Sequence, residues 1–128
     1  MKEVCPSVDF HLLKDITFNL SFLNYISKIA HCCDFEICGF FTAEKLYFVE
    51  NIAKLKRDSF VMHPSKYQYH WDDIQCFFHS HLYSGPDLSA LDEQSFEEYE
   101  QYHIIYSVKQ KKFLLYYPSS RKSVYFSI

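Results

Sequence analysis

The feature that most constrains the fold is an apolar run at residues 74–79, which leads through His79 to a second histidine, His81. Gln75 is the one polar residue before His79. Such a run predicts a buried strand, because a strand with one face in water would alternate apolar and polar residues. A buried strand has to lie inside a sheet, so the rest of the chain must supply strands beside it and layers over it.

The remaining apolar patterns predict helices and strands that can do this. Apolar residues recur at helical spacing along one face of residues 19–33. Two segments rich in aromatic and β-branched residues, 35–41 and 46–52, are separated by a polar break and predict a β-hairpin. A second helix is expected at 89–102, opening on a possible capping serine. Further strands are expected at 59–63, 103–108, 112–117 and 123–128, and a short helix or loop at 65–73.

The order of helix, strands, helix and strands predicts one mixed α/β (α+β) domain over residues 1–128, built on a single sheet flanked by helices. A chain of 128 residues has the length of a single domain. Hydrophobic residues make up 48% and aromatic residues 20%, enough for a core without disulfides. No linker, repeat or low-complexity segment divides the sequence.

The net charge and the cysteine content limit which binding partners and which cellular compartment we expect. The net charge is −3 and no concentrated basic face is present, so we expect no nucleic-acid partner. Residues 1–10 lack the apolar run of a signal peptide, and no stretch has the length of a membrane span. The five cysteines are odd in number and form no Cys-x-x-Cys pair, which favours free, buried thiols. We therefore expect a cytoplasmic protein.

The histidines at the end of the buried strand begin a pattern typical of a metal centre. Residues i and i+2 of a strand face the same side, so His79 and His81 present two imidazoles together. Asp92 lies at the start of the predicted second helix, which the intervening loop could fold back toward the strand end. Two nitrogens and one carboxylate oxygen would give zinc three protein ligands and leave the fourth position for water.

A hydrolase of this kind also needs a base and an oxyanion donor. Glu36 stands at the start of a predicted apolar strand, where a carboxylate is unusual, and could reach a water on the metal. Ser89 has a hydroxyl on the loop that leads to Asp92 and could donate to an oxyanion.

Each of these residues also has a structural interpretation. Ser89-x-x-Asp92 is a helix-capping box, His-x-His alone is a weak signal, and Glu36 could face solvent at a strand end. The whole set is a less probable coincidence than any of its parts. The other histidines have no partner at ligand spacing, and we expect most of them to be structural or exposed: His11, His31, His63, His70 and His103.

The His-Ser-His of residues 79–81, followed after seven residues by Ser89 and after two more by Asp92, resembles the signature of the JAMM (MPN-plus) metallopeptidases. The Glu-Ile-Cys-Gly stretch that begins at Glu36 resembles the one that carries their catalytic glutamate. The resemblance covers residues 17–118 and implies a JAMM/cytidine-deaminase-like sheet with one zinc ion at one end. It implies that His79, His81 and Asp92 are the ligands, Glu36 the general base and Ser89 the oxyanion donor.

Within that family, the sequence is most similar to the compact bacterial and phage members, which include the peptidase domain of the phage tail assembly protein. The similarity lies in Asn51-Ile52-Ala53, Phe60 and Pro64. Leu82 and Leu88 stand where many members have proline. Neither position supplies a ligand or a proton, so these departures bear on loop shape and substrate fit.

The resemblance implies zinc-dependent hydrolysis of a peptide or isopeptide bond in a polypeptide, such as a ubiquitin-like modifier or a phage tail protein. Two alternatives stay open at this point. One is a non-catalytic assembly or binding module with the same fold, and the other is a hydrolase of small amide conjugates. An open groove with a free strand edge would favour a polypeptide substrate.

Overall fold

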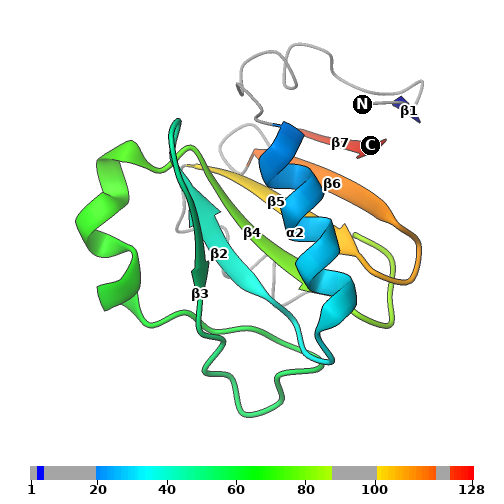
Figure 1. The fold of residues 1–128 in the computed structure, drawn as a ribbon, viewed down its shortest axis with the longest axis horizontal. Helices are drawn as coiled ribbons and strands as arrows, with labels where there is room; N and C mark the ends of the chain where they lie inside the picture. The colour runs from blue at the N-terminus through cyan, green and yellow to red at the C-terminus, as the bar shows by residue number, and fades with distance from the viewer. Residues whose placement is uncertain (1–2, 5–19, 88–100, 118–121) are drawn as a thin grey trace.

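The computed structural model describes residues 3–4, 20–87, 101–117 and 122–128. These residues form one mixed sheet of seven strands in the order β1-β7-β6-β5-β4-β2-β3 (Figure 1). The expected mixed α/β class with a single sheet is confirmed. The elements are β1 (Glu3–Val4), α2 (Leu20–Cys32), β2 (Cys38–Phe41), β3 (Leu46–Val49), η1 (Pro64–Lys66), η2 (Gln68–Asp73), β4 (Cys76–His81), β5 (Tyr102–Ser107), β6 (Lys112–Tyr117) and β7 (Lys122–Ser127).

Strand β4 is the buried strand that the apolar run predicts. It lies between β2, with which it pairs antiparallel, and β5, with which it pairs parallel. All six of its residues are buried. The strand continues to His81, so both histidines belong to it.

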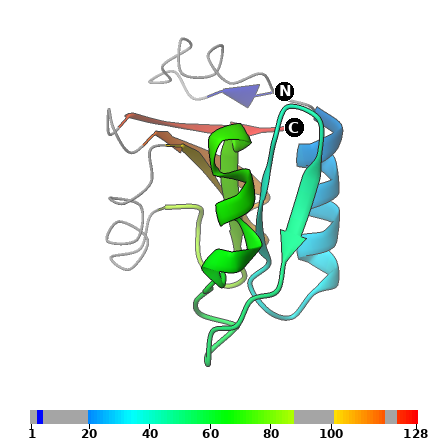
Figure 2. The same ribbon diagram turned by 90° about the vertical axis from the view of Figure 1, so that its left-hand side faces the viewer.

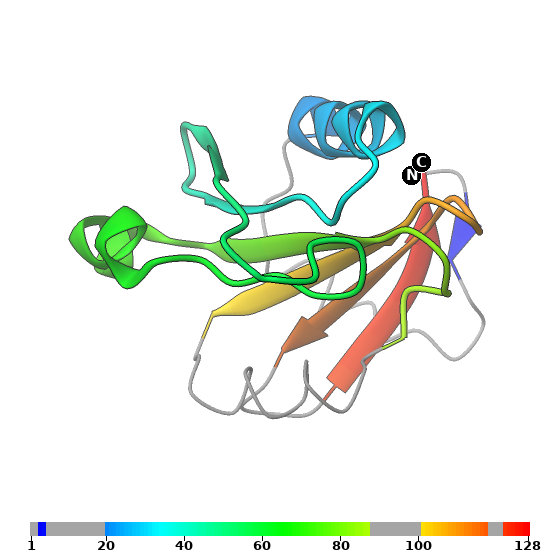
Figure 3. The same ribbon diagram turned by 90° about the horizontal axis from the view of Figure 1, so that it is seen from below.

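Helix α2 covers one face of the sheet (Figure 3), and it lies within the helix predicted at 19–33. Its apolar face buries Leu23, Ile26 and Ala30, which belong to the same core cluster as Phe41 and Phe78 of the sheet. The opposite face holds a second cluster around Phe40 and Phe77. Alternate residues of β2 and β4 thus enter two separate apolar layers. No described helix combines the length and apolar character that crossing a membrane requires.

The strand predicted at 59–63 is wrong. A strand needs a neighbouring strand as its hydrogen-bond partner, and here the side chain of Asn51 takes part of that place. The Val61 N–H donates to Oδ1 of Asn51 at 3.1 Å, and the Ile52 N–H donates to the Val61 carbonyl at 2.9 Å. Residues 59–63 are therefore held as an irregular segment. The following 3-10 helices, η1 and η2, lie at the β3 end of the sheet (Figures 1 and 2), and agree with the short helix or loop expected there.

The three C-terminal strands are present as predicted, and the first and last of them begin and end one residue earlier than expected. Tyr102, assigned by the pattern to the second helix, begins β5 instead and stacks on Tyr117 of β6, with ring centroids 4.5 Å apart. The rest of that predicted helix, together with its capping serine, falls mostly on residues 88–100, outside the described part of the chain. Strand β1 was not predicted, because two residues are too few to show a pattern.

Gly39 is required by close packing across the sheet. It lies on β2 opposite Phe78 of β4. A Cβ atom there would overlap the backbone carbonyl oxygen of Tyr47 and come within 2.7 Å of the Phe78 ring. Only glycine allows this approach.

We therefore predict that Gly39→Ala lowers the free energy of unfolding by about 3 kcal/mol, at the upper end of the usual cost of overpacking. Gly85→Ala is the matched control, since its nearest neighbours are the terminal atoms of the flexible Gln110 side chain. Denaturant unfolding of both variants measures the difference. Equal losses of stability would contradict the role given to Gly39.

Candidate metal centre

The structure brings Glu36, His79 and His81 together at one end of the sheet. Glu36 lies two residues before β2, and the antiparallel register that pairs Cys38 with His79 places it beside the end of β4. One ligand atom from each of the three residues lies within 4.8 Å of the other two. All three are buried, with exposed fractions of 5%, 0% and 6%. The alternative that Glu36 faces solvent is therefore wrong.

Ser80 lies between the two histidines but faces the other side of the sheet. It hydrogen-bonds to the segment that carries Glu36. Its hydroxyl accepts a hydrogen bond from the Ile37 N–H at 2.9 Å, and its own N–H donates to the Ile37 carbonyl at 3.0 Å. These bonds continue the contact between the two segments beyond the end of β2. They fix the backbone next to Glu36 against the strand that carries the histidines.

The side chain of Asn51 also hydrogen-bonds to the backbone of Glu36. Its amide nitrogen donates to the carbonyls of Glu36 and Ser59, each at 2.9 Å. Its carbonyl oxygen accepts from the N–H groups of Ala53 and Val61, at 3.0 and 3.1 Å. Asn51 is buried, and its side-chain donors and acceptor join the loop after β3 to the candidate site.

The hydrogen bond to Gly85 fixes the orientation and tautomer of His81. Nδ1 of His81 lies 2.8 Å from the Gly85 carbonyl oxygen. Because a carbonyl only accepts, Nδ1 carries the hydrogen, and Nε2 of the neutral ring carries a lone pair. That Nε2 lies 3.1 Å from Nε2 of His79. The two nitrogens therefore converge on one point.

The loop that supplies the Gly85 carbonyl is anchored to the end of β5. The Ser107 hydroxyl donates to the Ser84 carbonyl at 2.7 Å and accepts from the Gln110 N–H at 3.0 Å. The Gln110 side chain packs against the position that a Cβ atom of Gly85 would take. These contacts give the Gly85 carbonyl a fixed place beside His81.

Two residues that the sequence did not assign to the site, Phe60 and His103, contact His79. Phe60 stacks on its ring, with centroids 4.2 Å apart. Nε2 of His103 lies 2.8 Å from Nδ1 of His79. His103 is buried and reaches His79 because β5 pairs parallel with β4 and places His103 opposite Phe77, which agrees with the expectation that most such histidines are structural or exposed. The local sequence shows only a histidine at the start of an apolar strand. It does not indicate which strand will lie beside it.

The other described histidines lie away from the centre. His31 shares a 2.7 Å hydrogen bond with the Tyr106 hydroxyl, and Nδ1 of His63 accepts from the Ser65 N–H at the start of η1. The His70 ring packs against Tyr47. These roles agree with the expectation that such histidines are structural or exposed. His11 lies outside the described residues.

The structure does not place the other two predicted site residues. Asp92, the expected third ligand, and Ser89, the expected oxyanion donor, both lie outside the described residues. Within the part of the chain that is described, two imidazole nitrogens and one carboxylate oxygen form a group that could hold a metal ion.

Cys38 lies opposite His79 but does not belong to the group of described residues whose ligand atoms converge. Burial, followed by the nearby charge of Glu36, raises the pKa of its thiol to about 12. Its Sγ contacts the Val49 carbonyl at 3.4 Å, so the thiol remains protonated at neutral pH. The described cysteines are free, as expected, although Cys32 is exposed and the expectation of burial is wrong there.

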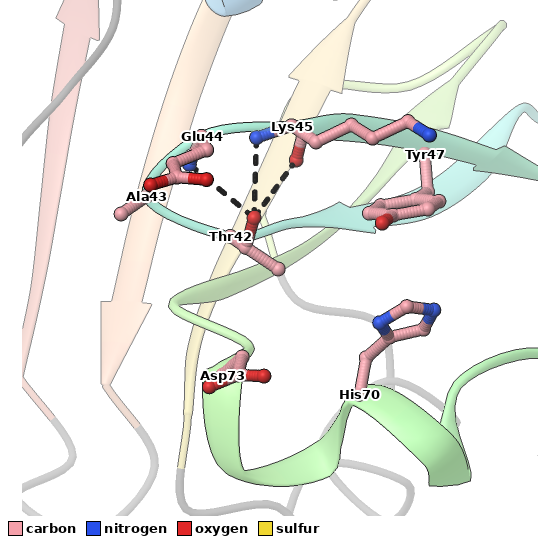
Figure 4. Close-up of a pocket in the computed structure, with 7 residues that line it drawn as sticks. All are labelled: Thr42, Ala43, Glu44, Lys45, Tyr47, His70 and Asp73. Atoms are coloured by element: carbon pink, nitrogen blue, oxygen red, sulfur yellow. Dashed lines mark hydrogen bonds between the residues drawn. The ribbon is translucent and has the colours of Figure 1, made fainter.

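A separate pocket of about 430 Å³ lies between the β2–β3 turn and η2 (Figure 4). The Thr42 hydroxyl accepts from the Lys45 N–H at 3.1 Å and shapes the turn. This pocket is at the far end of β2 from Glu36, so it is not the candidate metal centre. Its lining residues are Thr42, Ala43, Glu44, Lys45, Tyr47, His70 and Asp73.

Comparison with known proteins supports the fold and goes no further. No protein-family model matches the chain, and no curated protein matches its sequence. Among solved structures, protein DSY2949 from Desulfitobacterium hafniense is similar in its solution structure, with a TM-score of 0.63. The match covers 84% of this chain and 87% of that chain at 19% identity. At this identity the likeness shows a shared fold alone.

We predict that Asn51→Asp lowers the free energy of unfolding by at least about 2 kcal/mol, because the carbonyls of Glu36 and Ser59 lose their shared donor and face a carboxylate instead. The matched control is Asn24→Asp, the same chemical change at an exposed position of α2. Thermal and denaturant unfolding compare the two variants. If Asn51→Asp were no less stable than Asn24→Asp, the hydrogen bonds of Asn51 would not hold this loop.

Proposed function

We propose that this protein is a zinc metallopeptidase or isopeptidase of the JAMM type that hydrolyses an amide bond in a polypeptide. The observation that carries the proposal is the convergence of Glu36, His79 and His81 within 4.8 Å at one buried end of the sheet. These residues come from two separate segments, and the sequence signature assigned all three to the site.

The spacing of the imidazole nitrogens supports zinc. Two nitrogens bound at about 2.05 Å with a tetrahedral angle between them lie roughly 3.3 Å apart. The two Nε2 atoms of His79 and His81 are 3.1 Å apart, so both can bind one ion with little movement. Each Nδ1 is held by a further hydrogen bond, as is usual for metal-bound histidines. By the sequence resemblance, Asp92 is the third ligand.

The residues of this chain then have defined tasks in hydrolysis. Zinc would lower the pKa of water to about 7 and polarise the scissile carbonyl. A carboxylate oxygen of Glu36 takes a proton from the attacking water as the C–O bond forms. Glu36 then gives that proton to the leaving nitrogen as the C–N bond breaks, which yields a carboxylic acid and an amine. The hydroxyl of Ser89 donates a hydrogen bond to the developing oxyanion.

The metal assignment predicts about one zinc per chain in purified protein, and loss of most of it in His79→Ala, His81→Ala and Asp92→Ala. His63→Ala is the matched control, because His63 is exposed and lies outside the site. Metal analysis after gel filtration makes the measurement. Full zinc content in the double variant of His79 and His81 would end the assignment.

The role of Glu36 predicts that Glu36→Gln keeps the fold and the zinc but lowers kcat on a library of peptide and isopeptide substrates by about 10²–10⁴-fold. Glutamine is nearly isosteric with glutamate and cannot take up the proton. Glu44→Gln, at the exposed β2–β3 turn, should leave kcat unchanged. Turnover by Glu36→Gln at the wild-type rate would require another base.

Ser89 can be tested for both of its possible tasks with two variants. Ser89→Ala should lower kcat by about 10²–10³-fold if the hydroxyl donates to the oxyanion. Ser89→Asp keeps a good helix cap but puts a negative charge beside the oxyanion, so we expect a stable, zinc-loaded and nearly inactive protein. Zinc content is measured beside activity, because the new carboxylate must not displace the ion. Wild-type activity in Ser89→Asp would contradict the oxyanion role and leave helix capping as the task of the serine.

A further inference from the structure

The inference concerns Phe60, whose ring lies against the face of the His79 imidazole. The two ring centroids are 4.2 Å apart and the ring planes are inclined by 23°, so the rings are stacked. His81 and His103 approach His79 differently, since each meets it edge-on, with ring planes inclined by 61° and 71° and centroids 5.0 Å apart. Among the described ring contacts of His79, the stacked one therefore comes from Phe60.

The plane of an imidazole ring is only weakly fixed by its own side chain. Rotation about the Cβ–Cγ bond of histidine is a broad torsion, so the surroundings decide how the ring is turned. The lone pair with which an imidazole nitrogen binds a metal lies in the ring plane, and a turned ring aims it elsewhere. His79 cannot turn far about this bond, because one edge of its ring would then enter the Phe60 ring.

Phe60 has a fixed place of its own. It is half-buried and packs against the core cluster that includes Phe77. Both of its neighbours in the chain are held by the Asn51 side chain, which donates to the Ser59 carbonyl at 2.9 Å and accepts from the Val61 N–H at 3.1 Å. The ring therefore offers His79 a steady surface.

The segment that carries Phe60 also holds the proposed base. The Glu36 N–H donates to the Lys56 carbonyl at 2.7 Å, and the Glu36 carbonyl accepts from the Asn51 amide at 2.9 Å. Phe60 follows Lys56 by four residues. Residues 51–60 thus contact Glu36 through its backbone and His79 through an aromatic ring.

We propose that Phe60 is a positioning residue for metal binding, whose ring holds the His79 imidazole in the plane that directs its Nε2 toward Nε2 of His81. In this orientation the two nitrogens lie 3.1 Å apart. Phe60 itself supplies no ligand and moves no proton. The inference rests on the proposed function, because it assigns a task to a neighbour of the proposed metal ligands.

A phenylalanine that served only the core would behave differently when it is replaced. Leucine keeps an apolar side chain at position 60 but removes the flat ring, so a core role predicts a change in stability alone. Tyrosine keeps the ring. A role in positioning predicts that metal binding changes in Phe60→Leu and is preserved in Phe60→Tyr.

The first measurement is zinc affinity, by competition with a chromophoric chelator, for wild type and both variants. We expect Phe60→Leu to bind zinc about 10-fold more weakly, as is usual when a residue that orients a ligand is lost, and Phe60→Tyr to stay near wild type. Phe22→Leu is the matched control, because Phe22 is a half-buried ring on the other face of the sheet, with its centroid 5.7 Å from that of Phe41. It should bind zinc as wild type does.

The second measurement reports the orientation of the ligands. Cobalt(II) is bound in place of zinc, and its visible absorption bands depend on the geometry of the ligands around it. We expect the bands of Phe60→Leu to shift or broaden, and those of Phe60→Tyr and Phe22→Leu to match wild type. In wild type, which needs no variant to fold, NMR should show contacts between the ring protons of Phe60 and His79 in the zinc-loaded protein.

Unchanged cobalt bands in Phe60→Leu would overturn the inference whatever the zinc affinity, as would loss of the contacts between Phe60 and His79 in zinc-loaded wild type. Both results leave the zinc site standing. If wild type bound neither zinc nor cobalt, the proposed function would fall, and this inference with it.

Discussion

The pairing of β2 with β4, in the register that sets Cys38 opposite His79, is the constraint on which the core and the candidate site both depend. A shift by one residue would turn every side chain of β2 to the other face of the sheet. Phe40 and Phe41 would exchange layers, and the Glu36 segment would leave the end of β4. The two hydrogen bonds between Ser80 and Ile37 fix the same register one step beyond the last strand pair. Correct packing and assembly of the site are thus the same event.

The elements that the sequence predicted well are those whose signal is local. Helical spacing identified residues 20–32, and the apolar run identified β4, because each pattern reports a buried face of its own element. The irregular path of residues 59–63 could not be predicted, since it depends on a side-chain amide eight to ten residues away taking the place of a strand. The local sequence pattern does not show that a distant side chain will take the place of a neighbouring strand.

The candidate site was predictable to a similar extent. The signature named Glu36, His79 and His81, and they do converge. Their surroundings were hidden, because His103 reaches His79 only through the parallel pairing of β4 and β5, and Phe60 only through the loop after β3. Both contacts join segments that are far apart in the chain. Candidate ligand atoms can be recognised from spacing, while the groups that orient them depend on which strands become neighbours.

The alternation along β4 has an evolutionary consequence. Phe78 and Ser80 face the layer beneath α2, whereas His79 and His81 face the other side. One codon change at either histidine would remove a candidate metal ligand while the layer beneath the helix keeps its packing. A change at these positions can therefore alter the candidate site and leave the fold intact. Changes at Phe78 or Ser80, by contrast, disturb the packing that positions the histidines. They therefore affect the fold and the candidate site together.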